Sequence, residues 1–188
     1  ERKGLTDDTL VVHSGDHGKS SGHHGLQGKW SLYEHDLRVP LVMAGPDIPR
    51  NERSGALVHQ HDLFPTILEA AGVEDQPSDF ESLWPRLLTN DRGGRAHLYA
   101  ADRATMRSIR DQRWKLIEYR RDPVLDRGVD RTELFDLEND PHELNDLSAA
   151  PTHRERIQTM RAALIETLRH QGDPCLEAFG KPVSPGSQ

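Results

Sequence analysis

Residues 8–49 read DTLVVHSGDHGKSSGHHGLQGKWSLYEHDLRVPLVMAGPDIP, and this stretch decides the fold class. It contains two short apolar runs, residues 8–14 and 39–44, which predict buried strands because they are rich in β-branched and aliphatic side chains. Between them, residues 15–29 form a loop with glycine at five positions. Glycine permits positive φ angles and a close approach of the backbone to a ligand, so we expect a binding loop after the first strand.

The remaining sequence predicts two helices, then a sheet of a different kind with one more helix. Residues 62–71 begin with a capping Asp and end before Gly72, and residues 82–88 form a second, short helix. Consecutive short strands favour an antiparallel sheet, and four are expected, at residues 97–101, 106–110, 114–119 and 133–137. Residues 154–170 carry apolar side chains on one face and should form a helix that covers this sheet.

The order of these elements predicts an α/β chain with two parts. Residues 1–92 should form the end of a mixed sheet with flanking helices. Residues 93–171 should form a small α+β subdomain, an antiparallel sheet plus a C-terminal helix, and residues 172–188 a flexible tail. The chain begins at Glu1 rather than Met, so we expect it to be part of a longer protein, and its compartment stays open between the cytoplasm and the periplasm or secretion.

Composition excludes several classes of function. With 24 Lys and Arg against 31 Asp and Glu, the net charge is −7, and the lack of a separate basic block argues against nucleic-acid binding. No apolar run approaches the roughly 20 residues of a membrane-spanning helix. The single cysteine, Cys175, excludes an internal disulfide and a cysteine-built zinc site. The basic run at residues 110–121 alternates with apolar residues and predicts a solvated strand face, not a polyanion site.

A candidate metal site follows the first predicted strand. Asp16 and His17 stand between Gly15 and Gly18, which allow the chain to turn so that both side chains converge on one ion. A carboxylate oxygen and an imidazole nitrogen form a plausible partial shell for a divalent cation. The alternative interpretation is a solvated turn in which both residues lie at the surface.

The glycine loop also carries a candidate anion site. Lys29 supplies a point charge with several hydrogen-bond donors, as oxyanion recognition requires. His24, which precedes Gly25, is a candidate general acid or hydrogen-bond donor to a leaving oxygen. Elsewhere we expect Glu34 and His35 to lie at the surface or behind the site.

Several motifs in order give the chain a family resemblance. Over residues 8 to about 147 it resembles the type I sulfatases of the alkaline phosphatase superfamily. The matching elements, in chain order, are Asp16-His17-Gly18, His24-Gly25-Leu26-Gln27-Gly28-Lys29, Leu32-Tyr33-Glu34-His35, Arg38-Val39-Pro40-Leu41, Gly45-Pro46-Asp47-Ile48-Pro49, residues 62–68, Trp114-Lys115-Leu116-Ile117 and residues 133–143. The resemblance covers only the C-terminal part of such an enzyme.

The resemblance implies roles for individual residues. Asp16 and His17 would ligate a cation, usually calcium, with manganese or zinc as alternatives. Lys29 would contact the sulfate oxygens and the nucleophile, and His24 would be a substrate or active-site contact. The family's nucleophile is a formylglycine made from a Cys/Ser-x-Pro-x-Arg motif, which Cys175 does not match. We therefore expect that group upstream of this chain, and little or no activity from the chain alone.

The predicted function is accordingly that of a segment of a sulfuric ester hydrolase. The substrate would be a small-molecule or glycan sulfate ester, hydrolysed with the help of a metal ion and the formylglycine. Two alternatives remain. One is a phosphonate or phosphodiester hydrolase of the same superfamily, because both ester types are tetrahedral oxyanions. The other is a non-catalytic, sulfatase-like chain.

Overall fold

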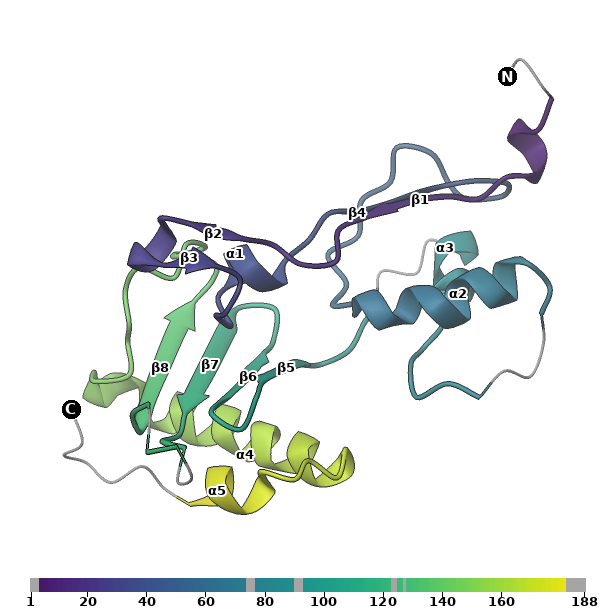
Figure 1. Ribbon diagram of the computed structural model, residues 1–188. Coiled ribbons are helices and arrows are strands. Elements are labelled where there is room, and N and C mark those ends of the chain that lie inside the picture. The colour runs from purple at the N-terminus through teal and green to yellow at the C-terminus, as the bar shows by residue number, and fades with distance from the viewer. Residues whose placement is uncertain (1–3, 74–76, 90–92, 123–124, 127, 182–188) are drawn as a thin grey trace. The chain divides into compact units, whose positions relative to one another are not determined.

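The computed structural model describes residues 4–73, 77–89, 93–122, 125–126 and 128–181. They form two compact units (Figure 1). The first unit comprises Glu1–Asp16 and Val39–Arg95, and the second His17–Arg38 and Ala96–Gln188. The glycine loop thus groups with the C-terminal sheet, although the sequence had placed it with residues 1–92. Part of the expected boundary, residues 90–92, lies outside the described residues.

The first unit contains the two strands expected in the opening stretch. After a short 3-10 turn, η1 (Thr6–Asp8), strand β1 (Val11–Ser14) pairs antiparallel with β4 (Leu41–Ala44). We predicted buried strands, but Val11 and Val42 are 57% and 60% exposed. The reason is geometric: successive side chains of a strand point to opposite faces, and among the described residues this ribbon has two strands and is not covered on both faces.

The helices of the first unit meet at one buried carboxylate. A 3-10 turn, η3 (Gln60–Asp62), leads into α2 (Leu63–Ala70), and α3 (Trp84–Thr89) follows. Asp62 was expected to cap α2, but it makes no side-chain cap bond there. Instead it accepts a hydrogen bond from the His59 amide at 2.7 Å and a bidentate pair from Arg95 at 2.5 and 2.7 Å. It also accepts the Glu81 amide at 3.3 Å, so this carboxylate joins three segments of the unit.

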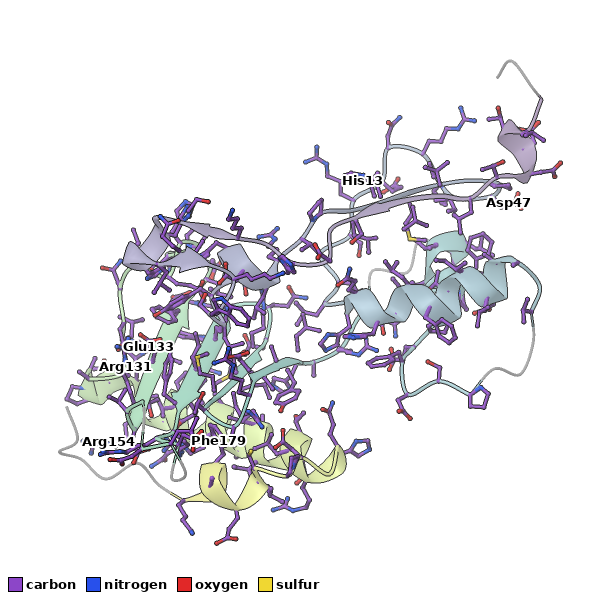
Figure 2. The ribbon with its side chains drawn as sticks, viewed as in Figure 1. His13, Asp47, Arg131, Glu133, Arg154 and Phe179 are labelled. Carbon is purple, nitrogen blue, oxygen red and sulfur yellow. The ribbon has the colours of Figure 1, made fainter. Side chains whose placement is uncertain are left out.

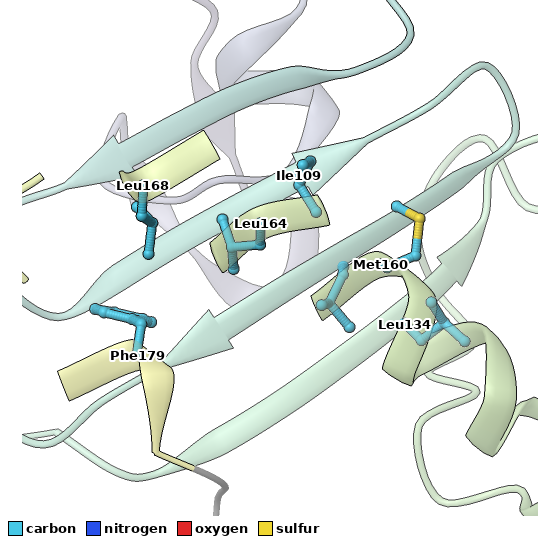
Figure 3. Packing of buried hydrophobic residues seen from close by; sticks show 7 residues of the cluster. Ile109, Leu134, Met160, Leu164, Leu168 and Phe179 are labelled. Atoms are coloured by element: carbon cyan, nitrogen blue, oxygen red, sulfur yellow. The ribbon is translucent and has the colours of Figure 1, made fainter. Parts of the chain in front are cut away.

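The second unit is built on the antiparallel sheet that the sequence predicts. Its order is β5 (Leu98–Asp102), β6 (Met106–Arg110), β7 (Trp114–Tyr119) and β8 (Arg131–Asp136). After a 3-10 turn, η4 (Pro151–His153), helix α4 (Arg154–His170) lies along one face (Figure 1). Seven side chains form the core between sheet and helices (Figure 3): Ile109, Leu116, Leu134, Met160, Leu164, Leu168 and Phe179.

The segment 17–38 covers the opposite face of this sheet. It contains β2 (Ser20–Ser21), η2 (His23–Gly25), β3 (Gln27–Gly28) and α1 (Glu34–Leu37). Leu32 and Tyr33 from this segment pack on Ile117 and Phe135, which alternate along their strands with the core residues of the other face. The basic run at residues 110–121 is therefore not a solvated face, as we expected. Lys115 within it is fully buried.

The C-terminal residues differ from the expected flexible tail. Residues 176–180 form α5 (Leu176–Gly180), and Phe179 is 1% exposed in the core. The guanidinium groups of Arg107 and Arg120 lie 5.1 and 4.9 Å from its ring centroid. The tail prediction was therefore wrong for residues 172–181, because composition does not reveal this packing, and residues 182–188 lie outside the described residues.

No helix in the described part of the chain is long and apolar enough to span a bilayer.

Candidate functional site

A short hairpin brings Lys29 and His17 together. β2 pairs with β3, Ser20 opposite Gly28, so the residues flanking the hairpin approach each other. Lys29 Nζ lies 2.6 Å from His17 Nε2, and His17 Nδ1 lies 2.7 Å from the Gly18 carbonyl oxygen. Because a carbonyl only accepts, Nδ1 carries the proton and Nε2 accepts from the Lys29 ammonium. The structure thus joins two of the four residues that the sequence selected.

Gly18 fixes the entry to this loop. Its amide donates to the Asp36 carbonyl at 2.8 Å, and the Lys19 amide donates to the His35 carbonyl at 3.0 Å. A side chain at Gly18 would overlap the His35 carbonyl oxygen, so only glycine allows the two backbone segments to approach this closely. The glycine next to His17 is therefore required by packing against α1.

The buried carboxylate of Asp36, which the sequence did not predict, binds both ends of the loop. Asp36, 3% exposed, accepts hydrogen bonds from the hydroxyls of Ser31 at 2.6 Å and Ser20 at 3.0 Å, and from the Ser31 amide at 3.1 Å. Burial alone would raise the pKa of Asp36, but the bonds from Ser31 and Ser20 lower it overall. A charged carboxylate therefore ties β2 to the residues that follow Lys29. In the sequence, Asp36 is marked only by its place after the Leu32-Tyr33-Glu34-His35 motif.

His24 has different partners from Lys29. Its backbone adopts the left-handed conformation, with φ of 53°, and its ring stacks on Tyr33 with centroids 4.0 Å apart. Its Nε2 lies 3.1 Å from the His142 carbonyl oxygen, to which it donates. These contacts direct the ring toward the 140s loop, whereas His17 is the histidine that pairs with Lys29.

The hydroxyl of Tyr33 joins this segment to the sheet. It donates to the carboxylate of Glu133 at 3.0 Å, and Tyr119 donates to the same carboxylate at 2.7 Å. Arg131, which points from the same strand, completes the group as the ion-pair partner of Glu133 (Figure 2). Burial is the main reason that the pKa of Tyr33 is raised, so its hydroxyl remains a donor at neutral pH.

Asp16 stands at the end of the first unit. Its side chain is exposed, and the Gly15 carbonyl beside it accepts a hydrogen bond of 2.6 Å from Gln60 Nε2. η3 therefore supports the turn that carries Asp16. Gln60 has no signal in the sequence, because no local pattern connects it with a glycine far upstream.

The residues of the candidate metal site fit a divalent cation in type but not in number. Asp16 offers carboxylate oxygens, and the His17 ring offers Nε2, both common ligand atoms. Among the described residues, no group of three or more His, Cys, Asp or Glu side chains surrounds one point. Of such side chains, the candidate site has two, Asp16 and His17.

Comparison with known proteins identifies relatives. Residues 22–171 match the family described as N-sulphoglucosamine sulphohydrolase, C-terminal. The chain is 31% identical to an N-acetylglucosamine-6-O-sulfatase of Bacteroides thetaiotaomicron, an alignment that covers 92% of this chain and 32% of the relative.

Two solved structures extend the comparison. One, in complex with its substrate D-glucosamine-2-N,6-O-disulfate, superimposes with a TM-score of 0.79 at 27% identity, covering 94% of this chain and 37% of the other. A phosphonate monoester hydrolase of Agrobacterium radiobacter superimposes with a TM-score of 0.68 at 25% identity, covering 90% of this chain and 36% of that enzyme. The chain spans about a third of the length of the curated relatives it matches.

Proposed function

Because this chain belongs to the N-sulphoglucosamine sulphohydrolase C-terminal family of sulfatases, we propose that it supplies the oxyanion-binding lysine and part of the metal shell of a sulfate ester hydrolase. The observation that carries the proposal is the 2.6 Å contact between Lys29 Nζ and His17 Nε2. In one exposed loop, this contact joins the Lys29 ammonium, a cation suited to an anionic ester, to His17. The Gly18 carbonyl sets the tautomer of the His17 ring.

The Lys29 ammonium has three N–H donors, of which His17 takes one. The others can donate to oxygens of a sulfate group. These hydrogen bonds strengthen as negative charge builds up on the oxygens during cleavage of the S–O bond. The Gly18 carbonyl holds the His17 ring in place, so Lys29 has a fixed partner before the substrate binds. Lys29 is therefore the catalytic residue we assign to this chain, and His24 is a further candidate substrate contact.

Asp16 and His17 are the residues we propose as ligands of a divalent cation, with calcium as the expected ion. A bound cation would take the Nε2 lone pair of His17 in place of the Lys29 ammonium, which would leave all three Lys29 donors for the ester oxygens. When bound, such an ion would neutralise charge on the ester oxygens. The formylglycine of the family does not fit any residue described here. Cys175 lies in the C-terminal segment, where its amide donates to Asp173 at 2.7 Å, and the neighbouring sequence lacks the required motif.

For the substrate we propose a sulfated sugar, with an amino sugar sulfate as the first candidate. The support is the relative named for N-acetylglucosamine-6-O-sulfate chemistry and the solved neighbour in complex with a glucosamine disulfate. A phosphonate ester is the second candidate, supported by the similarity to the phosphonate monoester hydrolase.

The test measures oxyanion binding by the 188-residue chain. Inorganic sulfate is titrated into the wild type, Lys29→Met and Lys19→Met, with binding followed by NMR. Lys19 is the matched control, because it is an exposed lysine of the same loop and bonds to His35 only through its backbone. Loss of a charged hydrogen bond should weaken binding about tenfold or more in Lys29→Met only.

Equal affinities for sulfate in all three proteins would contradict the role of Lys29. A parallel titration with methylphosphonate distinguishes the two ester classes, since tighter binding of methylphosphonate than of sulfate would favour the second candidate. A calcium titration of wild type and Asp16→Asn, with Asp7→Asn as an exposed control, tests the metal assignment in the same way.

A further inference from the structure

Below α1 lies a cluster of buried charges that the proposed mechanism does not use. Lys115, on β7, is fully buried, and its Nζ lies 3.0 Å from Glu34 Oε1 and 2.8 Å from Glu143 Oε1. Glu143 is also buried, 2% exposed. An isolated lysine would not remain charged in such a place, so the two carboxylates must compensate its charge.

Glu34 is the centre of the cluster. Besides Lys115, its carboxylate accepts a hydrogen bond of 2.6 Å from Arg110, and its backbone amide donates to Glu143 Oε2 at 2.5 Å. Two carboxylates thus face one ammonium and one guanidinium, and the charges balance. Burial alone would raise the pKa of Glu34, but Lys115 and Arg110 lower it overall.

Glu143 is held less completely than Glu34. Its Oε1 is close to Lys115 but outside hydrogen-bond geometry, and burial raises the pKa of this carboxyl despite the opposing effect of Lys115. Its backbone adopts the left-handed conformation, with φ of 58°. Glu143 thus lies at the start of α1 despite an unfavourable backbone conformation and an Oε1 atom that accepts no hydrogen bond.

The position of Glu34 determines the position of Lys29. α1 begins at Glu34, and three of the four residues that connect it to Lys29 are buried: Ser31 is bonded to Asp36, and Leu32 and Tyr33 pack on the sheet. The fourth, Trp30, is 61% exposed, and its ring centroid lies 4.9 Å from the Arg103 guanidinium. The backbone between Lys29 and Glu34 therefore has little freedom. A shift of Glu34 would be passed to the loop that carries Lys29 and His17.

We propose that Lys115 is a positioning residue: by anchoring Glu34 on β7, it fixes the place of the Lys29 ammonium and its contact with His17. The contribution to catalysis rests on the proposed function, but the positioning itself is a property of this chain. In this role Lys115 acts through the backbone of residues 30–34.

The experiment compares Lys115→Met with wild type in the 188-residue chain. Three quantities are measured: sulfate affinity, the nitrogen chemical shifts of the His17 ring, and amide exchange. The Gly18 and Lys19 amides report docking of the loop on α1, whereas amides of β6 and β7 report the sheet. Lys181→Met is the control, since Lys181 pairs with Glu177 at the exposed surface.

We expect Lys115→Met to accelerate exchange at Gly18 and Lys19 about tenfold or more, while the β6 and β7 amides change much less. The His17 shifts should move toward those of an unpaired ring, and sulfate should bind about tenfold more weakly. Lys181→Met should change none of these. Uniform acceleration at all sites, or unchanged His17 shifts and sulfate affinity, would show that Lys115 only stabilises the fold.

Two further variants keep the proposal testable if Lys115→Met does not fold. Combining it with Glu143→Gln restores the balance of buried charge, and Glu34→Gln alone weakens the anchor while keeping polar atoms for Lys115 and Arg110. Either should loosen Gly18 and Lys19 selectively. If the wild type binds no sulfate, the proposed function fails, but the His17 shifts and amide exchange still decide whether Lys115 positions Lys29.

Discussion

The two units of this chain differ in how much apolar surface they bury. The second unit has apolar clusters on both faces of its sheet, together with buried ion pairs such as those of Lys115 with Glu34 and Glu143. In the described part of the first unit, the buried apolar side chains are Leu57 and Leu83, each 6% exposed, and the most connected buried group is the Asp62 carboxylate. In the described residues, the second unit therefore combines a large apolar core with buried ion pairs, whereas the first has little buried apolar surface beside the Asp62 junction.

The largest effect should come from Phe179→Ala in the second unit. Phe179 is buried between two guanidinium groups and the core, so its removal should cost about 3–5 kcal/mol. The matched variant is Phe64→Ala in α2 of the first unit, where the ring is 56% exposed and the cost should be about 1 kcal/mol or less. Chemical denaturation followed by circular dichroism measures both. Equal losses would remove the proposed difference between the units.

A smaller effect is expected when the polar junction of the first unit is weakened. Asp62→Asn keeps the shape of the side chain but loses the charged, bidentate pair with Arg95, a loss of about 1.5–3 kcal/mol. Amide exchange should accelerate in α2 and remain unchanged in β6 and β7. Glu69→Gln, an exposed change on the same helix, is the control. Acceleration that extended through the sheet would mean that the units do not unfold separately.

The smallest effect concerns the pH dependence of loop docking in the second unit. His35 Nε2 lies 2.7 Å from Ser20 Oγ and 3.6 Å from Asp36, and its ring faces His23 and His24 at 5.0 and 5.5 Å. Burial lowers the pKa of His35, and the two histidines and the more distant Lys115 add to this, whereas Asp36 opposes it.

The folded chain therefore prefers neutral His35. Its contribution to stability is complete above the ordinary histidine pKa of about 6.5 and is lost as the pH falls from there through the lowered folded-state pKa. Exchange at Gly18 and Lys19 should accelerate between about pH 7.5 and 5.5, after correction for intrinsic rates, and less so in His35→Gln. An identical pH profile in both proteins would assign the effect to another group.

The sequence by itself determined the local elements of this protein. The bounds of β6, β7 and α4 agree with prediction, because polar turn residues separate the two short strands and the helical apolar pattern of α4 is strong. The sequence also selected His17 and Lys29 separately, each for its place among the glycines of the loop, and the structure places their side chains in contact. These predictions were possible because each depends only on residues that are close together in the chain.

Only the tertiary structure decided which polar residues are buried. Alternation along β7 shows that Lys115 and Leu116 lie on opposite faces, but not that the segment 17–38 covers the polar face. The burial of Lys115, the hydrogen bond from Gln60 to Gly15 and the docking of Phe179 all depend on partners distant in sequence. Their energies arise from contacts that exist only after the chain has folded, so no local pattern of residues encodes them.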